Sequence, residues 1–130
     1  KRLINNLTEI TFEGRIGIKE YWLTMFILMG AAFIFSFALT FFVVILMAMS
    51  SAETMPAYIF AIFIFAIIAY SVYVAIWSTS MMIRRLHDLN YSGWMYLISF
   101  IPYLGNIILL VFSLMPGKNE PNQYGPVRHY

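Results

Sequence analysis

The sequence predicts an all-α integral membrane protein with two long transmembrane helices and a third apolar segment that proline and glycine interrupt. Three observations predict this class. The 130-residue chain is 62% hydrophobic and 11% charged, whereas about a quarter of the residues in a soluble domain are charged. Uncharged blocks cover 21–49 and 57–83, and each exceeds the roughly 20 residues that cross a hydrocarbon core. Neither block has the polar stripe of a soluble core helix. The length fits a single membrane domain, 1–130.

The first segment, 1–20, is polar with spaced apolar residues. Leu3, Leu7 and Ile10 lie at i, i+4 and i+7, which places them on one face of a short helix. This spacing indicates an amphipathic helix on the membrane surface, and a loosely ordered tail is the alternative. We expect this segment to be the cytoplasmic, interfacial lead into the first span.

The stretch FEGRIGIKEYW, at 12–22, leads into the first transmembrane helix. Gly14 and Gly17 permit a turn. Basic and aromatic side chains follow where a helix enters the bilayer, a depth that suits groups with a polar end and an apolar body. These are Arg15, Lys19, Tyr21 and Trp22.

Two stripes of small residues predict how the two spans pack. In 21–49 the stripe is Ala32, Ser36 and Thr40, and in 57–83 it is Ser71, Ala75 and Thr79. Small residues spaced by four let helix backbones approach closely in lipid. We therefore expect the two helices to form an antiparallel hairpin.

A different face of the second span carries polar and aromatic residues at alternating spacings of three and four. One interpretation is a polar path or binding groove that descends from the arginines at the helix end. The alternative is an ordinary helix contact with an interfacial aromatic belt. The candidate residues are Tyr70, Tyr73, Trp77 and Ser80, continued by Arg84 and His87.

The charged turn 84–93 separates the second span from the third apolar segment. Arg84 and Asp88 are four residues apart and can pair if the helix continues past the membrane. Asn90 and Gly93 are expected to end the helix, with Gly93 permitting a left-handed turn.

The third apolar segment, 94–115, is long enough to cross the bilayer, but Pro102 and Gly105 interrupt it. It is therefore either a kinked third span or a re-entrant pair of short helices. The polar tail 116–130 is rich in Pro, Gly, Asn and Gln, which favours turns.

The distribution of Lys and Arg predicts the orientation. Four precede the first span, none lie in the connection 50–56, two lie in the turn 84–93 and two lie in the tail. Basic residues collect on the cytoplasmic side, so the N-terminus and the charged turn are expected to be cytoplasmic. The connection has one charge, Glu53, and Pro56 suits the start of the next helix.

Several chemical functions are disfavoured. The chain has no cysteine, which excludes thiol catalysis, disulfides and thiolate metal sites. It has no nucleophile elbow, phosphate loop or metal-ligand spacing, and His87 and Asp88 are adjacent on a helix and so do not face each other. We expect no enzyme activity, no catalytic residue, no metal and no cofactor. The short basic clusters resemble topology signals, not a nucleic-acid surface.

The remaining interpretations are a self-associating module or an accessory subunit of a membrane assembly, an oligomeric channel lined by the Tyr70 face, and a binder of anionic lipid. Guanidinium groups grip phosphate, so the candidate headgroup or partner residues are Arg15, Lys19, Arg84, Arg85, His87 and Asp88. The tail motif Asn122, Tyr124, Gly125 and Pro126 is expected to fold back onto the charged turn, or else to be ordered by a partner.

Three motifs in order, FEGRIGIKEYW, IRRLHDLNYSGW and IPYLGNIILLVFSLMPGKNEPNQYGP, resemble the domain-of-unknown-function-805 family of small bacterial inner-membrane proteins. The resemblance covers about 12–126. It implies a multi-pass protein of the bacterial inner membrane and no established reaction. Members often have an acidic residue after the YGP ending, where this chain has Val127.

Overall fold

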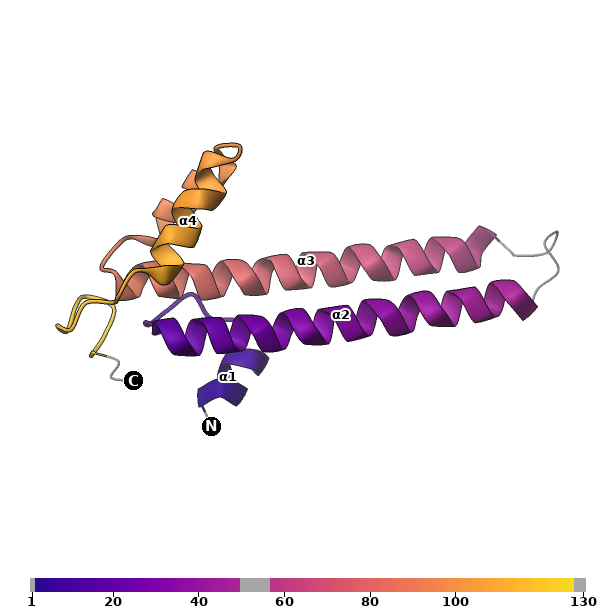
Figure 1. The fold of residues 1–130 in the computed structure, drawn as a ribbon, viewed down its shortest axis with the longest axis horizontal. Coiled ribbons are helices and arrows are strands. Elements are labelled where there is room, and N and C mark those ends of the chain that lie inside the picture. The colour runs from indigo at the N-terminus through magenta and orange to yellow at the C-terminus, as the bar shows by residue number, and fades with distance from the viewer. Residues whose placement is uncertain (1, 50–56, 128–130) are drawn as a thin grey trace. The chain divides into compact units, whose positions relative to one another are not determined.

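The computed structural model describes residues 2–49 and 57–127, and the all-α prediction is confirmed. No β-strand occurs in these two ranges. The predicted connection 50–56, with Glu53 and Pro56, lies outside the described residues. Along the chain, the elements are α1 (Arg2–Thr8), α2 (Ile18–Met49), α3 (Ala57–Asp88), the 3-10 helix η1 (Gly93–Phe100) and α4 (Leu104–Leu114) (Figure 1).

The two predicted spans are present as α2 and α3, each 32 residues long. At 1.5 Å per residue each helix is about 48 Å long, so both have the length and composition to cross a membrane. Helix α3 continues past the predicted end at Ile83 to Asp88. The short N-terminal helix is confirmed as α1, although Ile10 lies beyond its end and is exposed.

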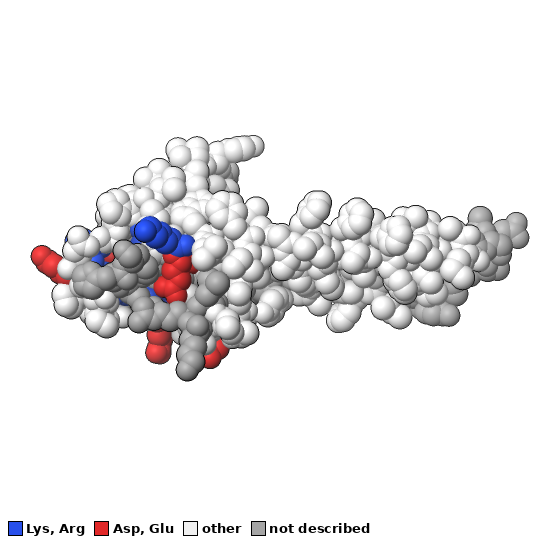
Figure 2. All heavy atoms as spheres, turned by 60° about the horizontal axis from the view of Figure 1, so that its bottom comes forward, with Lys and Arg blue, Asp and Glu red and all other residues white. Residues whose placement is uncertain are grey.

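The chain divides into two compact units. Unit 1 comprises Lys1–Met25 and Ile76–Tyr130, and unit 2 comprises Phe26–Ala75. The described part of unit 2 carries no charged residue. Figure 2 accordingly shows the charged side chains gathered over unit 1, while the described surface of unit 2 is uncharged.

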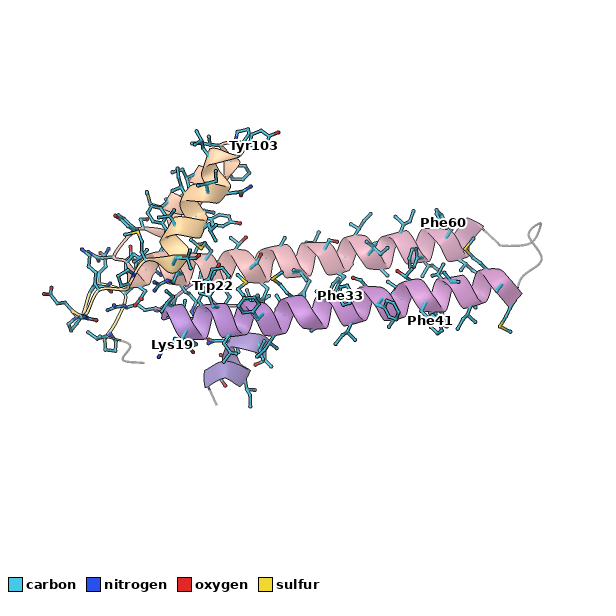
Figure 3. All side chains as sticks on the ribbon, viewed as in Figure 1. Lys19, Trp22, Phe33, Phe41, Phe60 and Tyr103 are labelled. Carbon is cyan, nitrogen blue, oxygen red and sulfur yellow. The ribbon has the colours of Figure 1, made fainter. Side chains whose placement is uncertain are left out.

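Within unit 2, the two small-residue stripes face each other as predicted. Ala32, Ser36, Thr40, Ser71 and Ala75 line one groove of about 400 Å³. The outward side chains are large and apolar, among them Phe33, Phe41 and Phe60 (Figure 3). Thr79 departs from the prediction, because it lies in unit 1 and its hydroxyl donates to the Tyr96 hydroxyl at 3.0 Å.

The third apolar segment is a pair of short helices, so the interpretation as one kinked span is wrong. Helices η1 and α4 pack against each other, and the chain reverses between them at Ile101–Tyr103. Tyr103 adopts a φ of 62° at the tip (Figure 3). A Cβ atom on Gly105 would lie 2.0 Å from the Ile98 carbonyl oxygen. Two backbones meet there, and glycine is what permits the contact.

The end of α3 also differs from the prediction. Asn90, with a φ of 65°, supplies the left-handed residue that was assigned to Gly93. The amide of Tyr91 donates to the carbonyl of Leu86, and the amide of Asn90 donates to that of His87. This pair of bonds is the Schellman ending of a helix. Gly93 instead begins η1, and its missing side chain leaves space beside Ile83 and His87.

Candidate functional site: a buried charged cluster in unit 1

Asp88 holds two buried arginines together. Its Oδ1 atom accepts from Arg15 Nε at 3.0 Å, and its Oδ2 atom accepts from Arg85 Nη1. All three residues are at least 97% buried. Arg84, which the sequence predicts as a partner of Asp88, instead donates to Asn6 Oδ1 at 3.0 Å. The cluster therefore joins the segment before α2 to the end of α3, a contact between distant parts of the sequence.

The Arg15 guanidinium is saturated with hydrogen bonds. Besides the bond from Nε, its Nη1 donates to the carbonyls of Glu120 and Gly125, at 2.9 and 3.3 Å. Its Nη2 donates to the carbonyls of Asp88 and Lys118, at 3.4 and 2.7 Å. These contacts match the five N–H donors of an arginine side chain. Arg15 thus organises the tail around its own charge.

The other two arginines are also bonded within unit 1. Arg85 donates to the carbonyls of Ile16 and Met115. The Asn6 side chain that receives Arg84 in turn donates to Glu20 Oε1 at 2.5 Å. We refer to these residues as the charged cluster: Asn6, Arg15, Glu20, Arg84, Arg85 and Asp88.

The tail folds back onto the end of α3, as the sequence predicts. Asn122 Nδ2 donates to the His87 carbonyl at 2.9 Å. The Tyr124 ring stacks on the His87 ring with centroids 3.8 Å apart. In addition, His87 Nδ1 lies 3.1 Å from the carbonyl oxygen of Gly14. His87 is thereby fixed from two directions, while Pro126 is exposed.

The remaining predicted residues are not brought together as one exposed polar face. Trp77 and Ser80 are buried in unit 1, where Ser80 donates to the Thr11 carbonyl. In unit 2, Tyr70 is half-buried and Tyr73 is exposed. Lys19, at the start of α2, is exposed (Figure 3).

Three residues of the site, Asn6, Glu20 and Gly117, were missed from the sequence. Asn6 is buried while its neighbour Asn5 is exposed, and nothing in their sequence context distinguishes them. At Gly117, a Cβ atom would lie 1.9 Å from Asp88 Oδ2. The run Met-Pro-Gly that closes the third segment is a turn signal, but it does not indicate that this glycine meets a buried carboxylate.

Residues 10–126 match the profile of the family described as "Protein of unknown function (DUF805)". The chain belongs to this family. The predicted resemblance is therefore confirmed, and all three DUF805 motifs contribute to unit 1. The first supplies Arg15, the second supplies Arg84, Arg85 and Asp88, and the third supplies the tail that surrounds Arg15.

Two curated relatives of this DUF805 chain come from Escherichia coli K12. "Inner membrane protein YhaH" is 33% identical over 118 residues, which cover 90% of this chain and 86% of the relative. "Inner membrane protein YhaI" is 30% identical over 116 residues, which cover 89% of this chain and 84% of the relative. No solved structure matches. These names, with the two long apolar helices, indicate a bacterial inner-membrane protein.

Proposed function

We propose that the protein is a non-enzymatic helical module of the bacterial inner membrane that associates with a second copy of itself. The charged cluster supports this reading, because its arginines are at least 95% buried and bonded within unit 1. Groups engaged in this way stabilise a fold and are poorly placed to bind substrate. The surface left for a partner is the apolar surface of unit 2.

The observation that carries the proposal is the groove between the small-residue stripes. Its hydroxyls need no partner from outside, since Thr40 donates to the Ser36 carbonyl and Ser71 to the Ile67 carbonyl. Tyr70 is different. Its ring packs on Phe35, with centroids 4.5 Å apart, and within the described residues its hydroxyl makes no hydrogen bond. An unpaired hydroxyl in hydrocarbon is costly.

A second copy supplies the missing partner. In a two-fold dimer, a residue near the axis meets its own counterpart. A phenol both donates and accepts a hydrogen bond, so one Tyr70 hydroxyl satisfies the other. The groove of small residues beside it lets the two hairpins approach closely.

Replacing Tyr70 with phenylalanine is expected to weaken self-association about 3- to 20-fold, the effect of one hydrogen bond between helices in a membrane. The ring and its contact with Phe35 are retained, so the change isolates the hydroxyl. The dimer fraction is measured by energy transfer between labelled copies as the protein is diluted in lipid.

The matched control is Tyr73→Phe, which makes the same chemical change at an exposed position outside the groove. It is expected to leave the dimer fraction unchanged. Equal effects of the two substitutions, or a wild-type chain that is monomeric at every protein-to-lipid ratio, would contradict the proposal. A foreign subunit in the intact particle after gentle extraction would support the accessory-subunit reading instead.

The other two functions are less well supported. A channel lined by Tyr70, Tyr73, Trp77 and Ser80 conflicts with the burial of Trp77 and Ser80 in unit 1. Headgroup binding by Arg15, Arg84 and Arg85 conflicts with the bonds that already engage these side chains. Of the basic candidates, exposed Lys19 remains suited to an anionic lipid surface.

We further infer that both the N-terminal segment and the tail face the cytoplasm. Arg15 bonds to tail carbonyls, which supports placing the two segments on one side of the membrane. Helices η1 and α4 are each about 16 Å long, roughly half of a ~30 Å hydrocarbon core. These features favour a re-entrant pair.

A reporter that is active only in the cytoplasm is therefore expected to be active when fused to either end of the chain. The matched control is the same reporter inserted in the connection 50–56, which should be silent. A silent C-terminal fusion that is stably expressed would overturn the re-entrant arrangement.

A further inference from the structure

Besides the groove in unit 2, the chain has a cavity of about 480 Å³ in unit 1, next to the charged cluster. Aromatic rings form much of its wall, and apolar side chains form most of the remainder. The residues that matter to its chemistry are Phe12, Ile83, His87, Trp94, Tyr96 and Tyr124. Cavities of this size and character are typical of sites for small organic ligands.

The His87 ring faces this cavity with Nε2, and the contact made by Nδ1 determines whether Nε2 carries a proton. The Gly14 carbonyl oxygen can only accept, so the contact at 3.1 Å requires a proton on Nδ1. In the neutral ring, Nε2 is then an acceptor. The Tyr124 stack and the Nδ1 bond hold the ring in place, so the direction of the Nε2 lone pair is fixed.

The acceptor has no partner within the described residues. His87 is 92% buried, and no hydrogen bond to Nε2 is formed there. Gly93 keeps the approach to it open, because a Cβ atom at that position would lie 3.5 Å from Nε2 and 2.9 Å from Ile83 Cγ2. Nε2 is therefore an open acceptor that faces the cavity, and a ligand with one donor group would pair with it.

The lining selects the class of ligand. Among the described residues, no acidic side chain lines the cavity, so none of them neutralises a cation there. The nearby arginines are bonded elsewhere, which disfavours an anion. Flat aromatic walls favour an aromatic ring. We propose that this cavity binds a neutral, membrane-soluble aromatic compound, a phenol or hydroquinone, whose hydroxyl donates to His87 Nε2.

The test compares two ligands of similar size on the wild-type protein in detergent. We expect 4-propylphenol to bind saturably and to shift the ¹⁵N resonance of Nε2. The chain has only two histidines, so this signal is readily assigned. We expect 4-propylanisole, whose oxygen cannot donate, to bind about 2- to 12-fold more weakly, as the net contribution of one hydrogen bond implies.

A matched pair of variants tests the place of binding. Gly93→Ala puts a methyl group beside Nε2 and is expected to weaken 4-propylphenol binding at least about 10-fold. Gly30→Ala makes the same change where a Cβ atom meets nothing within 4 Å, and it should bind as the wild type does. Equal affinity for the two ligands, no saturable shift, or full binding by a folded Gly93→Ala variant would overturn the proposal. The ligand comparison does not depend on self-association, so it fails or succeeds separately from the dimer proposal.

Discussion

Replacing Asp88 with asparagine is expected to lower the free energy of unfolding of unit 1 by about 3–5 kcal/mol. The substitution keeps the shape of the side chain and removes its charge. Arg15 and Arg85, at 1% and 0% exposure, would then share a buried site with no carboxylate between them. Breaking a buried ion pair by removing one partner has a cost of this size. Thermal unfolding in detergent, followed by tryptophan fluorescence, measures the loss.

The matched control is Glu13→Gln, which removes one negative charge from an exposed residue close to Arg15 in sequence. Its effect should stay within about 0.5 kcal/mol, as is usual for a surface substitution. Similar unfolding of the two variants would mean that net charge, and not the buried pairing, determines stability. That result would contradict the structural role assigned to the cluster.

The parts of the fold set by local pattern could be predicted from the sequence. Uncharged blocks predicted α2 and α3, because lipid tolerates few charges. The spacing of Ala32, Ser36 and Thr40 predicted which face of α2 turns toward α3. Pro102 and Gly105 predicted a break in the third apolar segment. A chain reversal was one of the two geometries that such a break permits.

The pairing within the charged cluster could not be predicted in the same way. Helical spacing relates Asp88 to Arg84, four residues earlier, but Arg15 reaches Asp88 from 73 residues away. Such contacts depend on how three segments pack, and helix periodicity carries no information about that. The roles of Asn90 and Gly93 were misassigned for a related reason. Both residues tolerate a left-handed backbone, and only packing beside His87 decides which position must lack a side chain.

The same packing links the cluster to the cavity. Asp88 fixes Arg15, and Arg15 holds the Gly125 carbonyl, next to the Tyr124 ring that covers His87. We therefore interpret the cluster as the support for the tail. The tail in turn forms part of the cavity wall, so the family motifs form this cavity only when they are assembled together.

Replacing Gly105 with alanine is expected to separate η1 from α4. The added Cβ atom would lie 2.0 Å from the Ile98 carbonyl oxygen and 2.8 Å from Ser99 Cα. Both are backbone atoms, so no side-chain rotation relieves the overlap, and the cost is about 3 kcal/mol or more. Hydrogen exchange of backbone amides measures the result. Exchange should rise across 93–100 and 104–114 while the uncharged part of α2 keeps its protection.

Gly30→Ala makes the same chemical change as Gly105→Ala, but its expected effect on stability is the opposite. Gly30 lies within α2, and a Cβ atom there meets nothing within 4 Å. Alanine favours the helix by about 0.5–1 kcal/mol over glycine, so this variant should be slightly stabilised. Unchanged exchange in both η1 and α4 of the Gly105→Ala variant would show that the two backbones do not meet at this glycine. The close contact, and with it the re-entrant pair, would then have to be abandoned.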